Sequence, residues 1–323
     1  MPRGVPGRAV RLEPAFHDRA AVRSIVEHAG PYISLARTAQ TQDEADASGR
    51  PAVTFVPPWF RRDLVVAGVS HVDDAEVILR NPPFIEAASE VFGGARVVEP
   101  TTVYVNVMAP TPFPFVPHVD IPIFRSASRA NCPVWLLHQM LRSGLFEDQR
   151  IKLATAVSWF YDGTGGEFHY WPDGVGAPSQ VEEPPFGNVA VVADNEQVFH
   201  GVGSVGHRAS AHPGSLTLEA ECDHVGSDWV IRDPEPVATH AEAAIRVTIS
   251  WKAEVFADEA EREATRDSAG SFPLGMIVDR FITDLEHKGI TVDAPDDPLH
   301  DAEWIELLAA TYPLPAPPIP SAS

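Results

Sequence analysis

The stretch TPFPFVPHVDIPIF, residues 111–124, contains the tripeptide His118-Val119-Asp120 at the end of a strand-like run. Residues two apart in a strand point to the same face, so this imidazole and this carboxylate can converge on one metal ion. Two ligands leave a metal site incomplete, and a third must come from elsewhere. His200, in the second strand-like run QVFHGV (residues 197–202), is the strongest candidate. The sequence therefore predicts a metal site made by His118, Asp120 and His200.

The ligand types at this predicted site indicate a kind of chemistry. Two histidines and one carboxylate on one triangular face leave three octahedral positions open, as in the facial triad of non-haem Fe(II) oxygenases. A rival pair is Glu167 with His169, but no second histidine follows it at a useful spacing in a similar setting. His138 lies on an expected helix and is interpreted as a packed or surface histidine. We therefore favour the triad over the rival pair.

Short strands separated by Gly, Pro, Asp and Asn surround these histidines and predict the fold class. The expected strands are Val97–Met108, Ala154–Tyr161, Glu167–Tyr170, Val189–Ala193, Val198–Val202, Ser215–Glu221, Trp229–Arg232 and Ile245–Phe256. Short strands with turn residues between them are typical of an antiparallel barrel or jelly roll. We predict a mainly β protein with flanking helices around a double-stranded β-helix core, which is the jelly-roll or cupin-like arrangement.

The chain is interpreted as a single domain, residues 1–323. Its expected parts are an N-terminal helical and mixed region (1–95), a jelly-roll core (96–256) with an insertion that carries its own hairpin (209–244), C-terminal helices (257–313) and a disordered Pro-rich tail (314–323). Within the first part, residues 1–17 are expected to be a loose arm. Asp18 is expected to cap a helix that ends near His28.

Composition excludes several classes of partner and suggests a compartment. The chain has 24 Lys and Arg against 45 Asp and Glu, a net charge of −21, which argues against nucleic acid and anionic membrane surfaces as partners. No apolar stretch is long enough to span a membrane, and the N-terminus lacks the apolar region of a secretory signal. With Cys132 and Cys222 as the only cysteines, a disulfide framework and a Cys-rich zinc site are excluded. These features predict a cytoplasmic protein.

The order of the motifs resembles that of the iron(II)- and 2-oxoglutarate-dependent dioxygenases, particularly their prolyl-hydroxylase-like branch. The resemblance covers roughly residues 100–256. The elements that carry it are, in order, His118-Val119-Asp120, Gly165-Gly166-Glu167, Pro185-Phe186-Gly187, His200 and Arg246-Val247-Thr248. It implies that His118, Asp120 and His200 hold Fe(II). It also implies that Arg246 binds the distal carboxylate of 2-oxoglutarate, whose keto-acid end chelates the iron.

The planar guanidinium of Arg246 suits this role because its donors match a carboxylate in pairs. Thr248 or Ser250 could add a hydroxyl donor, since residue parity places both on the face of Arg246. In the family the arginine usually follows the second histidine closely, whereas Arg246 lies 46 positions after His200 and Arg208 only 8. We favour Arg246, because Arg208 lies in an expected loop. Arg208 could then anchor the substrate's carboxylate or the same keto acid.

Four further residues are candidates for the inside of the site. Asn106 and Tyr104 share one face of the strand before His118. Either could point towards the keto acid or the substrate, although core packing explains them equally well. Trp159 is expected to pack in the core or to form a pocket wall. Arg125 could pair with an anionic group of the substrate, or form a surface salt bridge.

The resemblance implies an oxygenase that oxidises a small molecule with O2 and releases succinate and CO2. The substrate would be an amino acid or a biosynthetic intermediate, and the reaction a hydroxylation, desaturation or oxidative cyclisation. Iron halogenases of this superfamily have a small residue at the carboxylate position, so Asp120 disfavours halogenation. The alternatives are a non-haem iron oxidase or cyclase that needs no 2-oxoglutarate, a non-catalytic cupin-like binding protein, and a zinc hydrolase.

Overall fold

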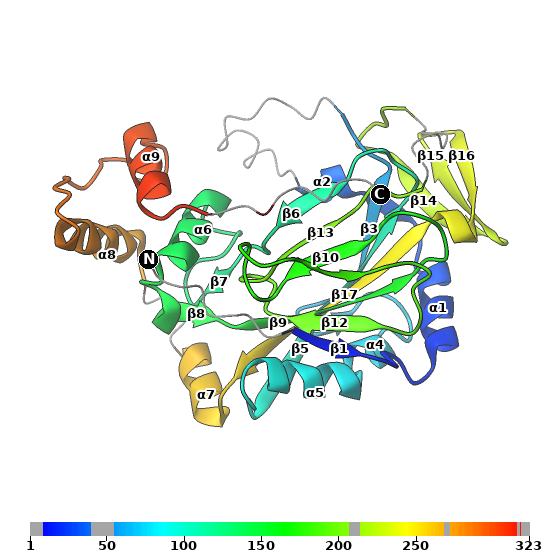
Figure 1. The fold of residues 1–323 in the computed structure, drawn as a ribbon, viewed down its shortest axis with the longest axis horizontal. Helices are drawn as coiled ribbons and strands as arrows, with labels where there is room; N and C mark the ends of the chain where they lie inside the picture. Colours follow the sequence, from blue (N-terminus) through cyan, green and yellow to red (C-terminus); the bar gives the residue numbers. More distant parts are fainter. Residues whose placement is uncertain (1–8, 40–54, 207–213, 268–271, 315–316, 318–323) are drawn as a thin grey trace. The chain divides into compact units, whose positions relative to one another are not determined.

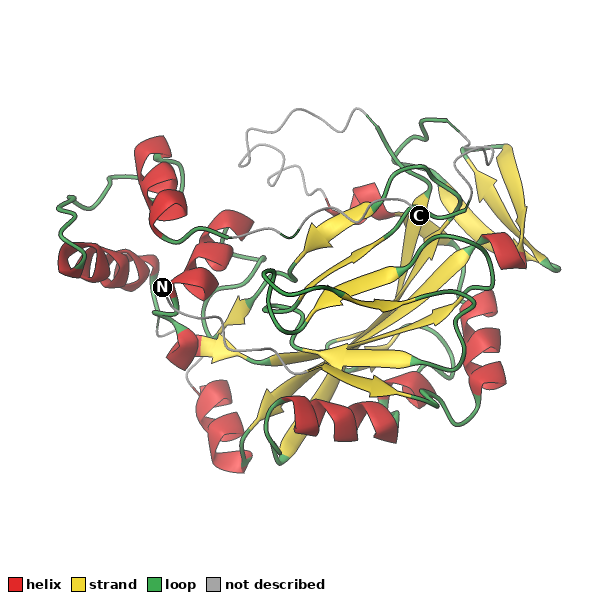
Figure 2. Cartoon of the chain, viewed as in Figure 1, coloured by secondary structure: helices red, strands yellow, loops and turns green. Residues whose placement is uncertain are grey.

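The structure is a computed structural model that describes residues 9–39, 55–206, 214–267, 272–314 and 317. Its contacts divide the chain into two compact units (Figure 1), one made of residues 1–119, 153–255 and 317–323 and the other of residues 120–152 and 256–316. Strands dominate the first unit and helices the second (Figure 2). Among the described helices, none combines the length and the apolar composition needed to cross a lipid bilayer.

The described part of the first unit consists of two sheets and the helices α1, α2, α4 and α5. Its elements are β1 (Ala9–Leu12), α1 (Arg19–His28), β2 (Tyr32–Ser34), α2 (Leu35–Ala39), β3 (Trp59–Val66), β4 (Val69–Ser70), α4 (Glu76–Leu79), α5 (Pro82–Val91), β5 (Val97–Met108), β6 (Phe115–His118), β9 (Leu153–Phe160), β10 (Phe168–Trp171), β11 (Gln180–Glu182), β12 (Ala190–Ala193), β13 (Phe199–Val202), β14 (Glu221–Val225), β15 (Asp228–Arg232), β16 (Pro236–Ala241), a 3-10 turn (Glu242–Ala244) and β17 (Arg246–Phe256). The large sheet has eleven strands in the order β1-β12-β9-β17-β5-β3-β2-β14-β15-β16, with β4 beside β3. The small sheet has the order β11-β10-β13-β6.

The two sheets face each other and enclose an aromatic core, the arrangement of a jelly roll (Figure 1). Val157 and Trp159 of β9 share this core with Phe168 and Tyr170 of β10. Alternate residues of a strand face opposite ways, so every second residue of the central strands points into the space between the sheets. The predicted fold class, a mainly antiparallel β protein with flanking helices and a jelly-roll core, is confirmed.

The outer face of the large sheet carries a second core, which helices cover. Val247, Ile249 and Trp251 of β17 are buried there beside apolar residues of α1, α4 and α5. The indole N–H of Trp251 donates to the carbonyl of Leu79 at 2.7 Å, which satisfies a polar group deep in this core. With one face of β17 committed to the apolar core, its polar residues Arg246, Thr248 and Ser250 face the other way.

The first helix begins where the sequence predicts. The Asp18 carboxylate accepts a hydrogen bond from the backbone N–H of Ala21 at 2.9 Å, and α1 ends at His28. We expect Asp18→Ala to lower the free energy of unfolding by about 1 kcal/mol, because an N–H of the first turn then lacks its protein acceptor. Urea denaturation of the two proteins measures this difference. Asp18→Asn should retain most of the stability, and a loss as large as that of alanine would contradict the capping role.

The second unit is a helical cluster around its own core. Its elements are β7 (Ile123–Phe124), α6 (Val134–Ser143), a 3-10 turn (Glu147–Gln149), β8 (Arg150–Ile151), α7 (Glu259–Asp267), α8 (Leu274–His287) and α9 (Ala302–Thr311). Phe146 and Phe281 lie at the centre, with ring centroids 5.0 Å apart, and Trp304 of α9 packs on Phe281. The C-terminal helices that the sequence predicts over residues 257–313 are present as α7, α8 and α9.

Two local predictions are wrong. Part of the expected loose arm is β1, in which Ala9 pairs with Ala193 and Leu12 with Ala190. A four-residue edge strand has too little pattern of its own, and its partner strand decides its structure. Residues 215–220 are not a strand, and β14 begins only at Glu221. β14, β15 and β16 extend the large sheet through β2.

Of the expected tail, all but Leu314 and Pro317 lie outside the described residues.

Candidate metal centre and anion site

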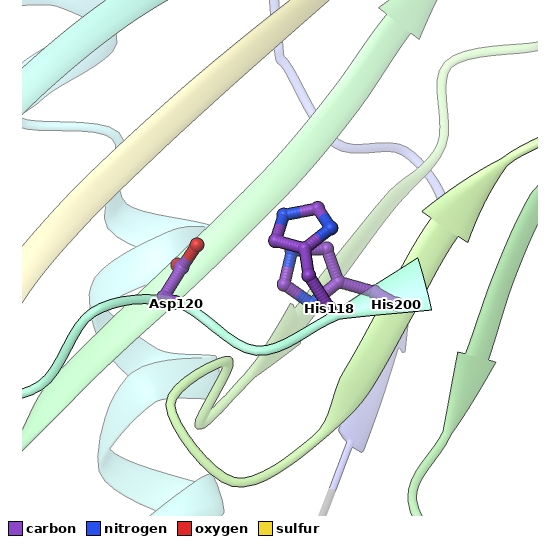
Figure 3. Close-up of side chains that lie close together, drawn as sticks. All are labelled: His118, Asp120 and His200. Atoms are coloured by element: carbon purple, nitrogen blue, oxygen red, sulfur yellow. The ribbon is translucent and has the colours of Figure 1, made fainter. Parts of the chain in front are cut away.

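The small sheet brings His118, Asp120 and His200 together. β6 and β13 are antiparallel neighbours, and His118 is the register partner of His200. The centroids of the two imidazoles are 4.4 Å apart. Asp120 follows the end of β6 by two residues, and one ligand atom from each of the three residues lies within 4.8 Å of the other two. Figure 3 shows the two rings side by side with the carboxylate projecting from the same side of the chain. The three groups could hold one metal ion.

Backbone carbonyls fix the tautomer of both histidines. Nδ1 of His118 lies 3.0 Å from the carbonyl of Val116, and Nδ1 of His200 lies 3.0 Å from the carbonyl of Val198. A carbonyl only accepts, so each Nδ1 is the protonated donor and each Nε2 keeps its lone pair. Such an outer hydrogen bond orients a metal-binding imidazole and raises its basicity. Both rings are therefore prepared to ligate through Nε2.

Aromatic rings flank the two histidines. Phe115 packs on His118 at 4.9 Å, Phe168 lies 6.0 Å from His200, and the side chain of His200 is only 7% exposed. Within the described ranges, 9–39, 55–206, 214–267 and 272–314, no other group of three possible metal ligands lies as close together. The rival pair Glu167 and His169 belongs to no such group.

Arg246 is a buried cation on the inner face of β17. The residue is 1% exposed. Its Nε donates to the carbonyl of Gly166 at 2.7 Å, and its Nη1 donates to Oγ1 of Thr248. Its Nη2 is buried and has no hydrogen-bond partner in the described part of the chain. Burial lowers the pKa of Arg246 to about 9, which still leaves the group charged at neutral pH.

An unpaired guanidinium in a protein interior is costly unless an anion meets it. In the part of the chain that the structure describes, no carboxylate forms an ion pair with Arg246; Glu167 raises the pKa of the guanidinium electrostatically, but by less than burial lowers it. Nη2 therefore presents an unpartnered, charged donor, a group to which a carboxylate ligand could bind. The side chain of Phe186 lies beside the guanidinium at 5.5 Å and helps to keep water away.

The other predicted inner residues line the same face of the large sheet. Thr248 and Ser250 are buried beside Arg246, and Trp159 is the register partner of Thr248. The indole N–H of Trp159 and Oδ1 of Asn106 are buried without partners among the described residues. The structure thus gathers four predicted residues on one polar stripe inside the jelly roll: Asn106, Trp159, Thr248 and Ser250.

The remaining predicted residues lie elsewhere. Tyr104 shares the face of Asn106, but the guanidinium of Arg61, which is also paired with Asp63, covers its ring at 3.7 Å. Arg125 belongs to the second unit, in the turn after β7, and its substrate role stays a prediction. Arg208 lies outside the described residues.

Sequence reasoning missed the role of Gly166 as the acceptor for Arg246. The signal was present in the pair Gly165-Gly166, because consecutive glycines before a strand indicate a backbone that approaches another group closely. It also missed Arg61, whose contact with Tyr104 depends on the pairing of β3 with β5.

The fold and these groups together define a jelly-roll protein with a candidate mononuclear metal centre on its small sheet and a buried cation on its large sheet. No protein-family model and no curated protein matches the sequence.

Solved structures similar to this chain include proteins of the family that the sequence resembles. An oxidoreductase of the 2OG-Fe(II) oxygenase family from Burkholderia pseudomallei has 12% identity, covers 76% of this chain and 84% of its own, and has a TM-score of 0.41. The non-heme alpha-ketoglutarate-dependent epimerase SnoN from nogalamycin biosynthesis has 10% identity and a TM-score of 0.39, and the match covers 78% of this chain and 80% of SnoN. A Pseudomonas putida prolyl-4-hydroxylase has 14% identity and a TM-score of 0.32, and the match covers 73% of this chain and 97% of the hydroxylase. Similarity at this level concerns the course of the backbone and carries no activity over to this chain.

Proposed function

We propose that the protein is a non-haem Fe(II)- and 2-oxoglutarate-dependent oxygenase that oxidises a small molecule. The observation that carries the proposal is the pairing of two features in one jelly roll: three metal-binding groups within 4.8 Å and a buried arginine with a vacant donor. His118, Asp120 and His200 would hold the metal, and Arg246 would hold the distal carboxylate of 2-oxoglutarate. Thr248, Ser250 and Asn106 are proposed to complete the cosubstrate site.

The residues fit both groups chemically. Two neutral imidazoles and one carboxylate are the donor set of mononuclear ferrous sites with open positions. The buried guanidinium needs an anion to offset its desolvation, and 2-oxoglutarate supplies a carboxylate at the end remote from its chelating keto acid. A hydrolase with zinc would use the three ligands but would leave Nη2 of Arg246 without an anion to bind.

When bound, ferrous iron and 2-oxoglutarate supply the oxidising chemistry. In a hydroxylation, substrate, O2 and 2-oxoglutarate give the alcohol, succinate and CO2, so one oxygen atom enters each oxidised product. The protein's own residues bind, orient and exclude water. The carbonyls of Val116 and Val198 hold the two imidazoles in one tautomer, Arg246 fixes the remote end of the keto acid, and the ring of Phe168 shields the buried His200.

The substrate class proposed is a small molecule, an amino acid or a biosynthetic intermediate, rather than nucleic acid. The net charge of −21 repels a phosphate backbone. Cys132 and Cys222 are both free, which fits a reducing compartment such as the cytoplasm, where ferrous iron is also retained.

An anaerobic titration tests the assignment directly. Fe(II) followed by 2-oxoglutarate should produce a weak visible charge-transfer band at one equivalent of each, and His118→Ala should abolish it. O2 should then be consumed, with succinate formed in equal amount. A protein that binds iron and consumes O2 with no requirement for 2-oxoglutarate would instead be a cosubstrate-independent oxidase. Tight Zn(II) binding without any band would favour a hydrolase, and no metal binding would favour a non-catalytic binding protein.

A further inference from the structure

A turn of consecutive glycines is bonded to the chain that follows the metal-binding strand β13. The backbone N–H of Gly166 donates to the carbonyl of Ser204 at 2.7 Å, and Gly165 forms an isolated bridge with Val205. On either side, the backbone N–H of Gly203 donates to the backbone carbonyl of Glu167 at 2.9 Å, and the N–H of Gly206 donates to the carbonyl of Thr164 at 2.8 Å. We call residues 163–166 together with residues 203–206 the glycine clasp.

Neither glycine of the turn can be replaced without displacing a neighbour. Gly165 and Gly166 have φ of +70° and +72°, which L side chains rarely adopt. A Cβ on Gly165 would lie 2.3 Å from the carbonyl oxygen of Ser204. A Cβ on Gly166 would lie 2.9 Å from Cδ of Arg246 and 3.3 Å from its Nε. The two backbones and the arginine therefore meet at a distance that only glycine permits.

The glycine clasp binds the guanidinium of Arg246 through its Nε. Nε of Arg246 donates to the Gly166 carbonyl, and among the described residues its other side-chain hydrogen bond runs from Nη1 to the Thr248 hydroxyl. Because the guanidinium is planar, the position of the Gly166 carbonyl also sets the direction in which Nη2 points. A shift of this turn would move the vacant donor with it.

The same clasp is tied to both strands that carry the histidines. Residues 203–206 directly continue β13, which bears His200. The carbonyl of Val205 also accepts from the N–H of Thr111 at 2.9 Å, a few residues before β6 and His118. Backbone hydrogen bonds thus connect the imidazole-bearing strands to the guanidinium without a flexible side chain between the clasp and the strands.

We propose that the glycine clasp fixes the separation between the metal-binding triad and Arg246, and so selects a five-carbon 2-oxo diacid over its six-carbon homologue. This inference rests on the proposed function. A diacid held at both ends has one length that satisfies both the metal and the guanidinium. A rigid separation therefore rejects a ligand one methylene longer, whereas a loosened arginine can follow it.

The test is a binding selectivity that needs no turnover. Mn(II)-loaded protein is titrated anaerobically with 2-oxoglutarate and with 2-oxoadipate by calorimetry. The wild-type protein should prefer 2-oxoglutarate about tenfold or more, the usual effect of one methylene in a fitted site. In Gly166→Ala the preference for 2-oxoglutarate over 2-oxoadipate should fall below about threefold. The new Cβ displaces Arg246, and the distance from the metal site to the guanidinium is then no longer fixed.

Gly174→Ala is the matched control. Gly174 has φ of +83°, but a Cβ there meets nothing within 4 Å, so this variant carries the backbone strain without the contact. It should keep the wild-type preference. Tyr161→Phe is a milder second variant, because it removes the hydroxyl that donates to the Thr164 carbonyl of the clasp at 2.7 Å. Tyr161→Phe should also lower the preference for 2-oxoglutarate over 2-oxoadipate. If Gly166→Ala does not fold, Tyr161→Phe tests the role of the clasp in its place.

The outcomes separate the two levels of inference. A wild-type protein that binds neither diacid overturns the proposed function. A wild-type protein that binds 2-oxoglutarate, with a preference that survives in a folded Gly166→Ala or in Tyr161→Phe, overturns the clasp and leaves the function standing. An equal weakening of both diacids would also overturn it, since that would show a structural role without selection of length.

Discussion

Protein carrying His200→Ala should lose tight binding of Fe(II), with a dissociation constant more than about 100-fold above that of the wild-type protein, since even outer hydrogen-bond partners of metal ligands contribute about 10–100-fold. His200 is the buried member of the triad and is the register partner of His118. Its loss leaves one imidazole and one carboxylate, which come from positions two apart in a single segment. Metal content after dialysis and an anaerobic Fe(II) titration measure the effect.

His169→Ala is the matched control for this experiment. His169 lies on the neighbouring strand β10 and is the register partner of Gly201, next to His200 in sequence. Its Nδ1 contacts Oγ of Ser179 at 3.3 Å, and it belongs to no group of metal-binding residues in the described chain. This variant should bind Fe(II) like the wild-type protein. If His169→Ala loses the metal and His200→Ala retains it, the rival pair of Glu167 and His169 is the metal site and the triad is wrong.

The strands of the jelly roll were predictable where a long alternating pattern existed. Every second residue of Arg246–Phe256 is apolar and buried in the helix-covered core, and Val97–Met108 buries Val103, Val105 and Val107 there in the same way. Short edge strands such as β1 and β16 lack such a pattern. Their structure depends on pairing partners far away in the chain, Ala190–Ala193 in the case of β1, and no local signal encodes that pairing.

The candidate metal site could be predicted because the spacing of its first two residues is short and places both side chains on one side of the chain. His118 and Asp120 are two apart, and one further histidine in a similar strand completes the set. The predicted assignment of Arg246 followed from a resemblance, and the structure adds its burial and its vacant Nη2. The link from Gly166 to Arg246 spans 80 positions. Such a contact follows only from the packing of the β9–β10 connection against β17.

Arg246→Leu should raise the dissociation constant for 2-oxoglutarate about 30-fold or more, because removing one partner of a buried charge pair costs about 2–5 kcal/mol. Fe(II) binding should be unchanged, since Arg246 is not one of the three metal-binding groups. The free protein should be as stable as the wild type or more so, because Arg246 is desolvated and its Nη2 is unpaired. Calorimetric titration and thermal unfolding, each with and without 2-oxoglutarate, measure these effects.

The thermal data distinguish a cosubstrate anchor from a structural cation. At 100 times its wild-type dissociation constant, 2-oxoglutarate should stabilise the wild-type protein by about 2.7 kcal/mol, and the same concentration should stabilise Arg246→Leu by less than about 1 kcal/mol. Arg80→Leu, which changes an exposed arginine paired with Glu76 on α4, should keep the full stabilisation. If Arg246→Leu unfolds more easily without ligand and still binds 2-oxoglutarate normally, the guanidinium serves the fold and the keto acid is held elsewhere. If neither protein responds to 2-oxoglutarate while both bind iron and consume O2, the oxidation runs without a keto acid.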